Sequence, residues 1–334
     1  MYATLWQHTG VNNLLEVRGL SVHIPLTPHI LRAVDHVSFD LARGETLGLV
    51  GESGSGKTMT ALALMRLLEP PLSDLPTGEV SLEGQDLMRL SEREMSGLRG
   101  RALSMVFQEP MTSLNPVMSV GGQIAEPLRR HMKLGASAAL RRAEEMLALV
   151  GIPEPARVAR GYPHQLSGGM RQRAMIAIAL ACQPALLIAD EPSTALDVTV
   201  QAQLLELLAG LQRDFGTAML LITHDLAVVA ETANRVAVMY AGPIVETGPV
   251  AAIFANPRHP YTRGLLASIP RIERERAAML HEIPGMVPSA AERPAGCAFA
   301  PRCPRAVAHC WEEPPPLEPA EPAHLVACWR HADG

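Results

Sequence analysis

The stretch between residues 46 and 68 constrains the fold of this chain more than any other part of its sequence. A short apolar run, Thr46 to Val50, leads into Gly51-Glu52-Ser53-Gly54-Ser55-Gly56-Lys57-Thr58, and an apolar stretch from Thr58 to Leu68 follows. Glycines at this spacing let successive backbone amides turn toward one phosphate group, and a following helix adds the positive end of its dipole. The pattern predicts a buried strand, a phosphate-binding loop (P-loop) and a helix. The predicted phosphate contacts come from Gly51, Ser53, Gly54, Ser55, Gly56 and Lys57.

Two side chains of this loop have predicted roles of their own. Of the 29 basic residues in the chain, only Lys57 and Lys133 are lysines, so a lysine inside the loop points to a chemical requirement. Lys57 is expected to contact the outer phosphate oxygens. Thr58, on the first helical turn, is expected to give a hydroxyl ligand to Mg²⁺.

A second buried strand is predicted to end in two carboxylates. The apolar run Ala185 to Ala189 is followed by Asp190 and Glu191, and ligands of open α/β sheets collect at the carboxyl ends of strands. Asp190 is expected to hold Mg²⁺, and Glu191 to accept a proton from the attacking water. Together with the P-loop, these acids predict a nucleotide hydrolase.

The segment Leu166-Ser167-Gly168-Gly169-Met170 resembles the signature of the ATP-binding cassette (ABC) family. Gln108, the segment Ser193 to Asp197 and His224 match that family's Q-loop, D-loop and switch histidine in order and spacing. The resemblance implies that ATP is the nucleotide and that Gln108, a further Mg²⁺ ligand, and His224 belong to the catalytic set. It also implies that two ABC subunits close head to tail, so that one subunit's signature contacts the ATP held by the other's P-loop. The signature residues expected to do so are Ser167, Gly168 and Gly169.

The adenine contact departs from the family pattern. Family members usually carry an aromatic residue in an early strand, where this chain has Val22-His23-Ile24. Ile24 or His23 is therefore expected to cover the adenine ring.

Two further segments, Phe107 to Pro116 and Arg258 to Thr262, resemble the ATP-binding subunits of dipeptide and oligopeptide importers. The resemblance implies a motor for peptide uptake, with nickel or another small solute as the alternative cargo. It implies as partners two membrane-spanning permease subunits, a second ABC ATPase, most commonly a related chain, and an extracytoplasmic substrate-binding protein. The expected location is the cytoplasmic face of the inner membrane.

Four of the five cysteines lie near the end of the chain, with the spacing C-x5-C-x6-C-x17-C. Four thiolates suit either an iron-sulfur cluster or a structural zinc, and the C-x2-C spacing of zinc knuckles is absent. Pro304 follows Cys303, as proline follows a ligand cysteine in bacterial ferredoxins, and the resemblance to this subfamily implies a 4Fe-4S cluster. Zinc and unmetallated thiols are the alternatives. The cysteines concerned are Cys297, Cys303, Cys310 and Cys328.

The alternation of apolar runs predicts an α/β fold. We expect a P-loop NTPase (RecA-like) core with an amino-terminal antiparallel β subdomain, a helical insertion and a small carboxyl-terminal Cys-rich domain. Residues 12–257 are assigned to the ABC nucleotide-binding domain, with a helical subdomain at about 112–168. Residues 258–334, rich in proline, are assigned to the peptide-transporter-type terminal domain.

Charge and hydropathy bear on the remaining classes of function. The net charge of -5 gives no basic field for nucleic acid. We find no apolar run of about 18 residues or more and no export signal, so the chain itself is not expected to span a membrane. A soluble ABC ATPase of DNA repair or translation is the main rival, and it is disfavoured by the single cassette and the absence of a coiled-coil insertion. An iron-sulfur redox protein is disfavoured by the complete catalytic set.

Overall fold

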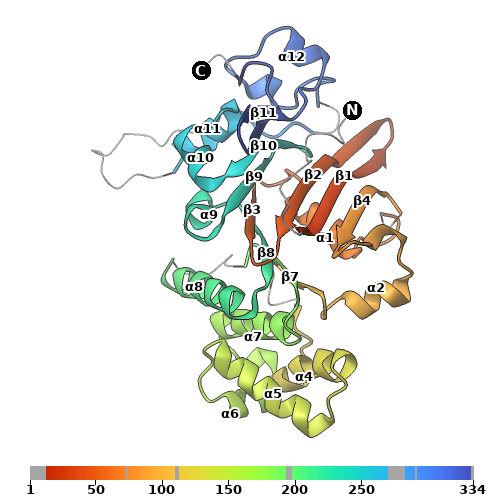
Figure 1. Ribbon diagram of the computed structural model, residues 1–334, viewed down its shortest axis with the longest axis vertical. Coiled ribbons are helices and arrows are strands. Elements are labelled where there is room, and N and C mark those ends of the chain that lie inside the picture. Colours follow the sequence, from red (N-terminus) through yellow and green to blue (C-terminus); the bar gives the residue numbers. More distant parts are fainter. Residues whose placement is uncertain are drawn as a thin grey trace. The chain divides into compact units, whose positions relative to one another are not determined.

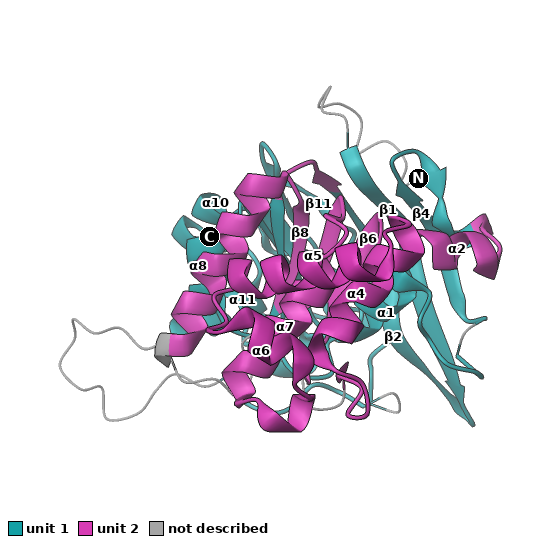
Figure 2. Ribbon diagram, turned by 90° about the horizontal axis from the view of Figure 1, so that it is seen from below, with its two compact units in different colours: residues 1–40, 46–88, 223–334 teal, residues 41–45, 89–222 magenta. Residues whose placement is uncertain are grey.

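The computed structural model describes residues 13–72, 74–109, 113–192, 198–269, 283–289 and 292–331, without the side chains of residues 198 and 199. The chain divides into two compact units, coloured separately in Figure 2. Unit 1 comprises residues 1–40, 46–88 and 223–334, and unit 2 comprises residues 41–45 and 89–222.

Unit 1 contains a four-stranded sheet in the order β2-β1-β4-β5, which confirms the predicted antiparallel subdomain. Residues 14–17 and 22–24 lie in one long strand of this sheet. The register shifts between Arg18 and Ser21, where Gly19 adopts a positive φ of 60°. The strands are β1 (Asn13–Leu26), β2 (His29–Ala42), β4 (Pro76–Leu82) and β5 (Gln85–Asp86).

Unit 1 also contains strands in the order β11-β12-β10-β9-β3. β3 and β9 are parallel, and every other pair in this series is antiparallel. Residues beyond 240 therefore add antiparallel strands to the parallel pair. The strands are β3 (Thr46–Val50), β9 (Arg235–Met239), β10 (Ile244–Pro249), β11 (Glu318–Glu321) and β12 (His324–Val326).

A buried carboxylate fastens the terminal strands to the rest of unit 1. Glu246 on β10 is fully buried, and its Oε1 lies 2.8 Å from Nε2 of His324 on β12. The backbone amides of Arg258 and His259 donate to the same carboxylate at 2.6 and 3.0 Å. Burial raises the pKa of Glu246, but these hydrogen bonds outweigh it and the net shift is downward.

An aromatic cluster packs the helices of unit 1 onto this sheet. The ring of Tyr240 lies 4.6 Å from that of Tyr261 and meets Phe299 edge-on at 5.1 Å. All three side chains are buried. The surrounding helices, which Figure 1 shows near β9 and β10, are α9 (Leu226–Thr232), α10 (Val250–Ala255) and α11 (Pro260–Ala267). A further short helix of unit 1 is α12 (His309–Glu312).

Unit 2 contains three parallel strands in the order β8-β7-β6, as predicted for the alternating pattern. Their side chains are buried throughout, which is typical of parallel strands covered on both faces. The strands are β6 (Leu103–Val106), β7 (Leu186–Asp190) and β8 (Ala218–Thr223).

The described helices of unit 2 include α4 to α7, which lie in the sequence between β6 and β7. Ser119 caps α4 by accepting from the Gly122 amide at 3.2 Å, and Val120, Ile124 and Leu128 form its buried face. Among the described residues, no helix is long and apolar enough to cross a membrane. The helices are α2 (Glu92–Leu98), α4 (Val120–His131), α5 (Ala136–Leu149), α6 (Pro155–Arg160), α7 (Gly168–Leu180) and α8 (Val198–Phe215).

The buried imidazole of His259 makes the stability of unit 1 depend on pH. Its Nδ1 accepts from the Tyr261 amide at 3.1 Å and caps α11, and burial lowers the pKa of His259 from 6.5 to about 4. As pH falls from 6.5 to 4 the unfolded chain binds a proton that the folded chain refuses. The free energy of unfolding therefore loses about 3 kcal/mol over this window from His259 alone.

The variant His259→Asn keeps a capping oxygen but cannot titrate. Urea unfolding at several pH values should show a smaller loss between pH 6.5 and 4 in His259→Asn than in the parent chain. If the free energy of unfolding fell equally with pH in the two proteins, the lowered pKa of His259 would be contradicted. The titration of Glu246 contributes to both proteins and therefore does not affect the difference between them.

Candidate functional site

The P-loop connects β3 to α1 (Lys57–Met65) in unit 1 as the sequence predicts, although the helix ends at Met65 rather than Leu68 because Arg66 turns left-handed. Gly56 has a φ of 105°, and a Cβ added there would lie 2.1 Å from the carbonyl oxygen of Ala33. Glycine is therefore required at Gly56 by its backbone conformation and by its neighbour.

Several groups of the loop can bind an anion. The first amides of a helix have no partner within the helix, and the dipole of α1 favours negative charge at this end. The ammonium group of Lys57 lies inside the loop, where it donates to the carbonyls of Gly51 and Glu52 at 2.8 and 3.1 Å. The hydroxyl of Ser55 is buried and has no hydrogen-bond partner in the part of the chain that the structure describes. This donor set fits a phosphate group.

The carboxylates of unit 2 follow β7 as expected. Asp190 is the last residue of β7 and is 1% exposed. Glu191 follows it with a φ of 44°, a left-handed conformation that costs a non-glycine residue about 1 kcal/mol or more. Its amide donates to the Ile222 carbonyl at 2.8 Å, which holds the turn in this conformation.

Gln108 and Glu191 meet at the carboxyl ends of two neighbouring strands. β6 and β7 pair in parallel, with Val106 opposite Ala189, so the residues that follow each strand emerge side by side. The Gln108 amide donates to Oε2 of Glu191 at 3.1 Å. An amide and a carboxylate at such an edge can position a water molecule and a metal ion together.

The signature serine begins α7. The Ser167 hydroxyl accepts from the Met170 amide at 3.4 Å and caps this helix, and both Ser167 and Gly168 are exposed. A Cβ added to Gly168 would meet nothing within 4 Å, and one added to Gly169 would meet only a methyl group of Val200 at 3.6 Å. Contacts among the described residues therefore explain neither glycine.

His224 is exposed and follows β8 directly. The next residue, Asp225, caps α9 by accepting from the Ala227 amide at 2.8 Å. The predicted D-loop, Ser193 to Asp197, and residues 110–112 of the segment that follows Gln108 lie outside the described residues.

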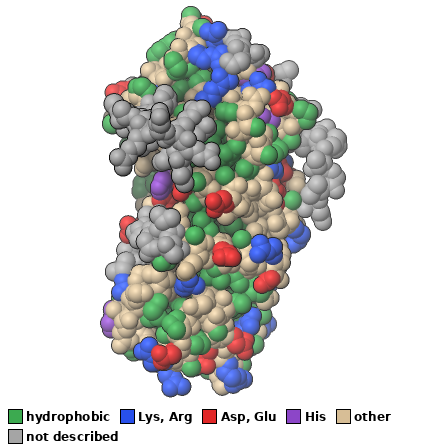
Figure 3. Space-filling view, turned by 90° about the vertical axis from the view of Figure 1, so that its left-hand side faces the viewer, with side chains coloured by type: hydrophobic (Ala, Val, Ile, Leu, Met, Phe, Trp, Pro, Cys, Tyr) green, Lys and Arg blue, Asp and Glu red, His purple; other side chains and the backbone are tan. Residues whose placement is uncertain are grey.

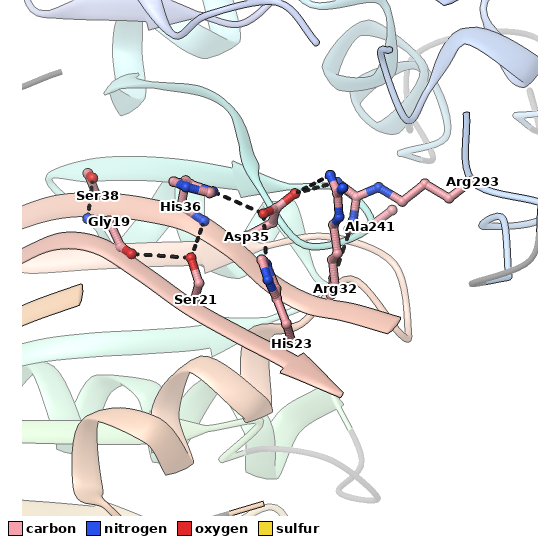
Figure 4. A network of polar contacts seen from close by, with 9 residues as sticks. All are labelled: Gly19, Ser21, His23, Arg32, Asp35, His36, Ser38, Ala241 and Arg293. Atoms are coloured by element: carbon pink, nitrogen blue, oxygen red, sulfur yellow. Dashed lines mark hydrogen bonds and ion pairs between the residues drawn. The ribbon is translucent and has the colours of Figure 1, made fainter. Parts of the chain in front are cut away.

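The two candidates for the adenine contact differ in their surroundings. Figure 4 shows the His23 side chain pointing toward Asp35. Nε2 of His23 lies 3.0 Å from Oδ1 of Asp35. His36 and Arg293 bind the same carboxylate, which holds the pKa of Asp35 low against the opposing effect of burial. Ile24 is half-buried near the end of β1. The His23 side chain is thus held by its contact with Asp35. Ile24 stays the predicted adenine contact.

The four clustered cysteines line one pocket of unit 1, together with His259, Phe299 and Trp329. Burial, followed by the effects of neighbouring thiols, raises the pKa of Cys297 to about 11. All five cysteines are free thiols. Within the described ranges, no group of three or more His, Cys, Asp or Glu side chains is arranged to hold a metal ion.

Sequence reasoning missed two residues that contact the P-loop. The Tyr261 hydroxyl accepts from the Glu52 amide at 2.8 Å, and Arg302 forms an ion pair with the Glu52 carboxylate at 2.8 Å. Tyr261 lies in a segment noted only for its family resemblance, and no local pattern distinguishes Arg302 from the other arginines.

The P-loop between β3 and α1 and the acidic end of β7 define the P-loop NTPase class. Residues 34–194 match the family described as ABC transporter, and residues 245–310 match the oligopeptide/dipeptide transporter carboxyl-terminal region. An ATP-binding cassette solved as a dimer in a post-hydrolysis state with ADP and phosphate is similar in structure. Its TM-score is 0.63 and its identity 26%, over 71% of this chain and 98% of that one.

Full-length relatives narrow the family further. The chain is 53% identical to a probable peptide ABC transporter ATP-binding protein of Sinorhizobium fredii, over 95% of both chains. It is 51% identical to the oligopeptide transport ATP-binding protein OppD of Bacillus subtilis, over 96% of this chain and 89% of the relative. It is 48% identical to the dipeptide transport ATP-binding protein DppD of the same species, over 96% and 95%. The chain belongs to this family of ABC transporter ATP-binding proteins and is an ABC ATPase.

The surface drawn in Figure 3 carries charges of both signs. Over the lower part of that view, acidic and basic side chains are interspersed among hydrophobic ones. This part of the surface is therefore not a single-sign field of the kind that concentrates nucleic acid.

Two loop glycines give a direct test of the P-loop geometry. Gly56→Ala combines a positive φ with the clash against Ala33 and should lower the free energy of unfolding by about 2 to 4 kcal/mol. Gly54→Ala has a φ of 79° but open space around the new Cβ, so it should cost only about 1 kcal/mol. Urea unfolding of both variants measures the difference, and equal losses would contradict the close approach of Ala33.

Proposed function

We propose that this chain hydrolyses ATP to power an importer of dipeptides or oligopeptides. The observation that carries the proposal is the phosphate-binding geometry of the P-loop, in a chain about half identical to peptide-transport ATP-binding proteins over nearly its whole length. The chemistry needs a phosphate cradle, a base and a metal site, and the chain has candidates for all three.

The sequence motifs and the family to which the chain belongs support the following roles. The P-loop amides and Lys57 bind the β- and γ-phosphates. Mg²⁺, when bound, neutralises charge on these phosphates. Thr58, Asp190 and Gln108 would hold it. Glu191 would accept a proton from the water that attacks the γ-phosphorus, and His224 would contact the γ-phosphate. Ile24 covers adenine.

A second ABC subunit completes the site in this proposal. Ser167 and Gly168 are exposed at the start of α7, a helix of 13 residues whose amino-terminal amides can bind a phosphate. With Gly169 they would contact an ATP held by the partner's P-loop. Closure and reopening of this pair would then drive the transport cycle.

The remaining partners and the domain division belong to the same proposal. Two permease subunits, a second ATPase and an extracytoplasmic binding protein form the complex, with this chain at the cytoplasmic face of the inner membrane. Residues 12–257 form the nucleotide-binding domain and residues 258–334 the terminal domain. The match of residues 245–310 to the peptide-transporter terminal region supports the second assignment.

The importer proposal predicts how ATP hydrolysis responds to its partners. In lipid, with the permeases, the second ATPase and the binding protein present, hydrolysis should rise on addition of a peptide. Stimulation by nickel or another solute would identify the alternative cargo. Activity indifferent to these subunits but raised by DNA or ribosomes would overturn the proposal in favour of a soluble ABC ATPase.

The variant Glu191→Gln provides the matched test of the chemical step within that complex. It should retain ATP binding, while hydrolysis falls by a factor of about 10² to 10⁴ because the base is lost. Glu206→Gln, an exposed substitution on α8, should leave hydrolysis unchanged. Near-normal turnover in Glu191→Gln would remove Glu191 from its proposed role.

The cysteine pocket is proposed to hold a 4Fe-4S cluster. Four thiols around one pocket provide the ligand set that such a cluster requires. Because burial raises the pKa of Cys297 to about 11, metal binding must displace its proton and should weaken as pH falls.

Chain purified without oxygen should therefore contain iron and sulfide in equal amounts and absorb in the visible range. Cys297→Ala should lose both, and Cys182→Ala should keep them, because Cys182 is a buried cysteine in the turn after α7 and outside this pocket. Zinc in place of iron would identify the structural alternative, and a metal-free chain would leave the thiols as core residues.

A further inference from the structure

Glu52, inside the P-loop, is bound on both its backbone and its side chain by residues more than 200 positions away. Its amide donates to the Tyr261 hydroxyl at 2.8 Å. Its carboxylate accepts from both terminal nitrogens of Arg302, at 2.8 and 3.2 Å. These residues all belong to unit 1. The carboxylate is 29% exposed and the Arg302 side chain only 6% exposed.

The guanidinium of Arg302 has an acceptor for each of its five N–H groups. Besides the Glu52 carboxylate, the Tyr240 hydroxyl accepts at 3.3 Å, and the carbonyls of Ile283 and Pro284 accept at 3.1 and 2.9 Å. The guanidinium carbon also lies 5.7 Å from the centre of the Tyr240 ring. A lysine at this position offers three donors in a different geometry, so the site is specific for arginine.

Tyr261 is equally constrained. Its side chain is fully buried and packs against Tyr240 and Phe299. Burial raises the pKa of Tyr261, so the hydroxyl stays neutral and accepts the Glu52 amide proton. The ring cannot turn away without disturbing the aromatic cluster.

Hydrogen bonds hold the peptide units on both sides of Glu52. On the carboxyl side, the Glu52 carbonyl accepts from Lys57 and from the Ser55 amide, at 3.1 and 3.2 Å. On the amino side, the amide is held by Tyr261. The next two residues, Ser53 and Gly54, are exposed. The turn is therefore anchored at Glu52 and open immediately after it.

We propose that Arg302 and Tyr261 are positioning residues that hold the P-loop in its phosphate-binding conformation through Glu52. The inference rests on the proposed function, because it requires that the loop bind a nucleotide. A loop that is already ordered loses less conformational entropy when it binds a nucleotide. The contacts of Arg302 and Tyr261 with Glu52 should therefore strengthen nucleotide affinity. Once the phosphates are bound they order the loop themselves, and the chemical step should change little.

The test is a double-mutant cycle on the full-length chain, with a fluorescent ATP analogue and Mg²⁺ as the probe. Arg302→Gln and Glu52→Gln should each weaken binding about tenfold, as expected for loss of a partly buried charged hydrogen-bond pair. The double variant should also be weakened about tenfold, because the two residues act as one unit. Tyr261→Phe should weaken binding as well, through the unpaired Glu52 amide.

A split in kinetic constants distinguishes positioning from general damage to the fold. In Arg302→Gln, KM for ATP should rise about tenfold while kcat stays within about twofold of the parent value. Arg263→Gln is the control and should leave both constants unchanged, because among the described residues Arg263 donates only to the Pro257 carbonyl, in the same unit. If Arg302→Gln does not fold, Arg302→Lys replaces it in the cycle and should weaken binding in the same non-additive way.

The outcomes separate the inference from the proposed function. If the parent chain binds no nucleotide, both are overturned. If the parent binds and the variants bind equally well, or if the two losses add to about a hundredfold, the positioning role is overturned while the ATPase function stands. A fall in kcat at unchanged KM would also overturn the positioning role.

Discussion

The conformation at Gly56 is the constraint on which the phosphate-binding end of unit 1 depends. Ala33 on β2 approaches so closely that any side chain at Gly56 would collide with its carbonyl. The Gly242 amide donates to the Ser55 carbonyl, and the Asp35 amide donates to the Gly242 carbonyl. Three segments distant in sequence therefore meet around one glycine. A glycine at position 56, which suits a phosphate, is thus also required by the packing of β2 and the turn after β9 against the loop.

The same end of unit 1 depends on polar groups that are buried only because they are fully paired. An isolated buried carboxylate is strongly disfavoured. Glu246 is tolerated because His324 and two backbone amides satisfy it, and these contacts join β10, β12 and the start of α11. The segment that begins at α11 then supplies Tyr261, and a later turn supplies Arg302. The terminal residues are therefore part of the surroundings of the P-loop, which gives a physical reason for a nucleotide-binding subunit to carry them.

Features carried by neighbouring residues could be predicted from the sequence, and features made by distant residues could not. The P-loop, the acidic end of β7 and the cap of α7 are each encoded within a few positions, so their patterns were sufficient. The contact between Gln108 and Glu191 needed the parallel pairing of β6 and β7, although both residues were singled out in advance. Arg302 and Glu52 are 250 positions apart, and nothing local marks either. β11 has the sequence Glu-Pro-Ala-Glu, without strand periodicity, and forms only because β12 offers it an edge.

The glycines of the P-loop and of the signature differ in what explains them. At Gly56 a side chain would strike this chain's own backbone, so the residue is accounted for within unit 1. At Gly168 a Cβ would meet nothing among the described residues, and the helix start there is exposed. Contacts among the described residues therefore do not account for glycine at this position. The proposed closure with a second subunit does, because a phosphate held by that subunit needs close access to the backbone amides at the start of α7.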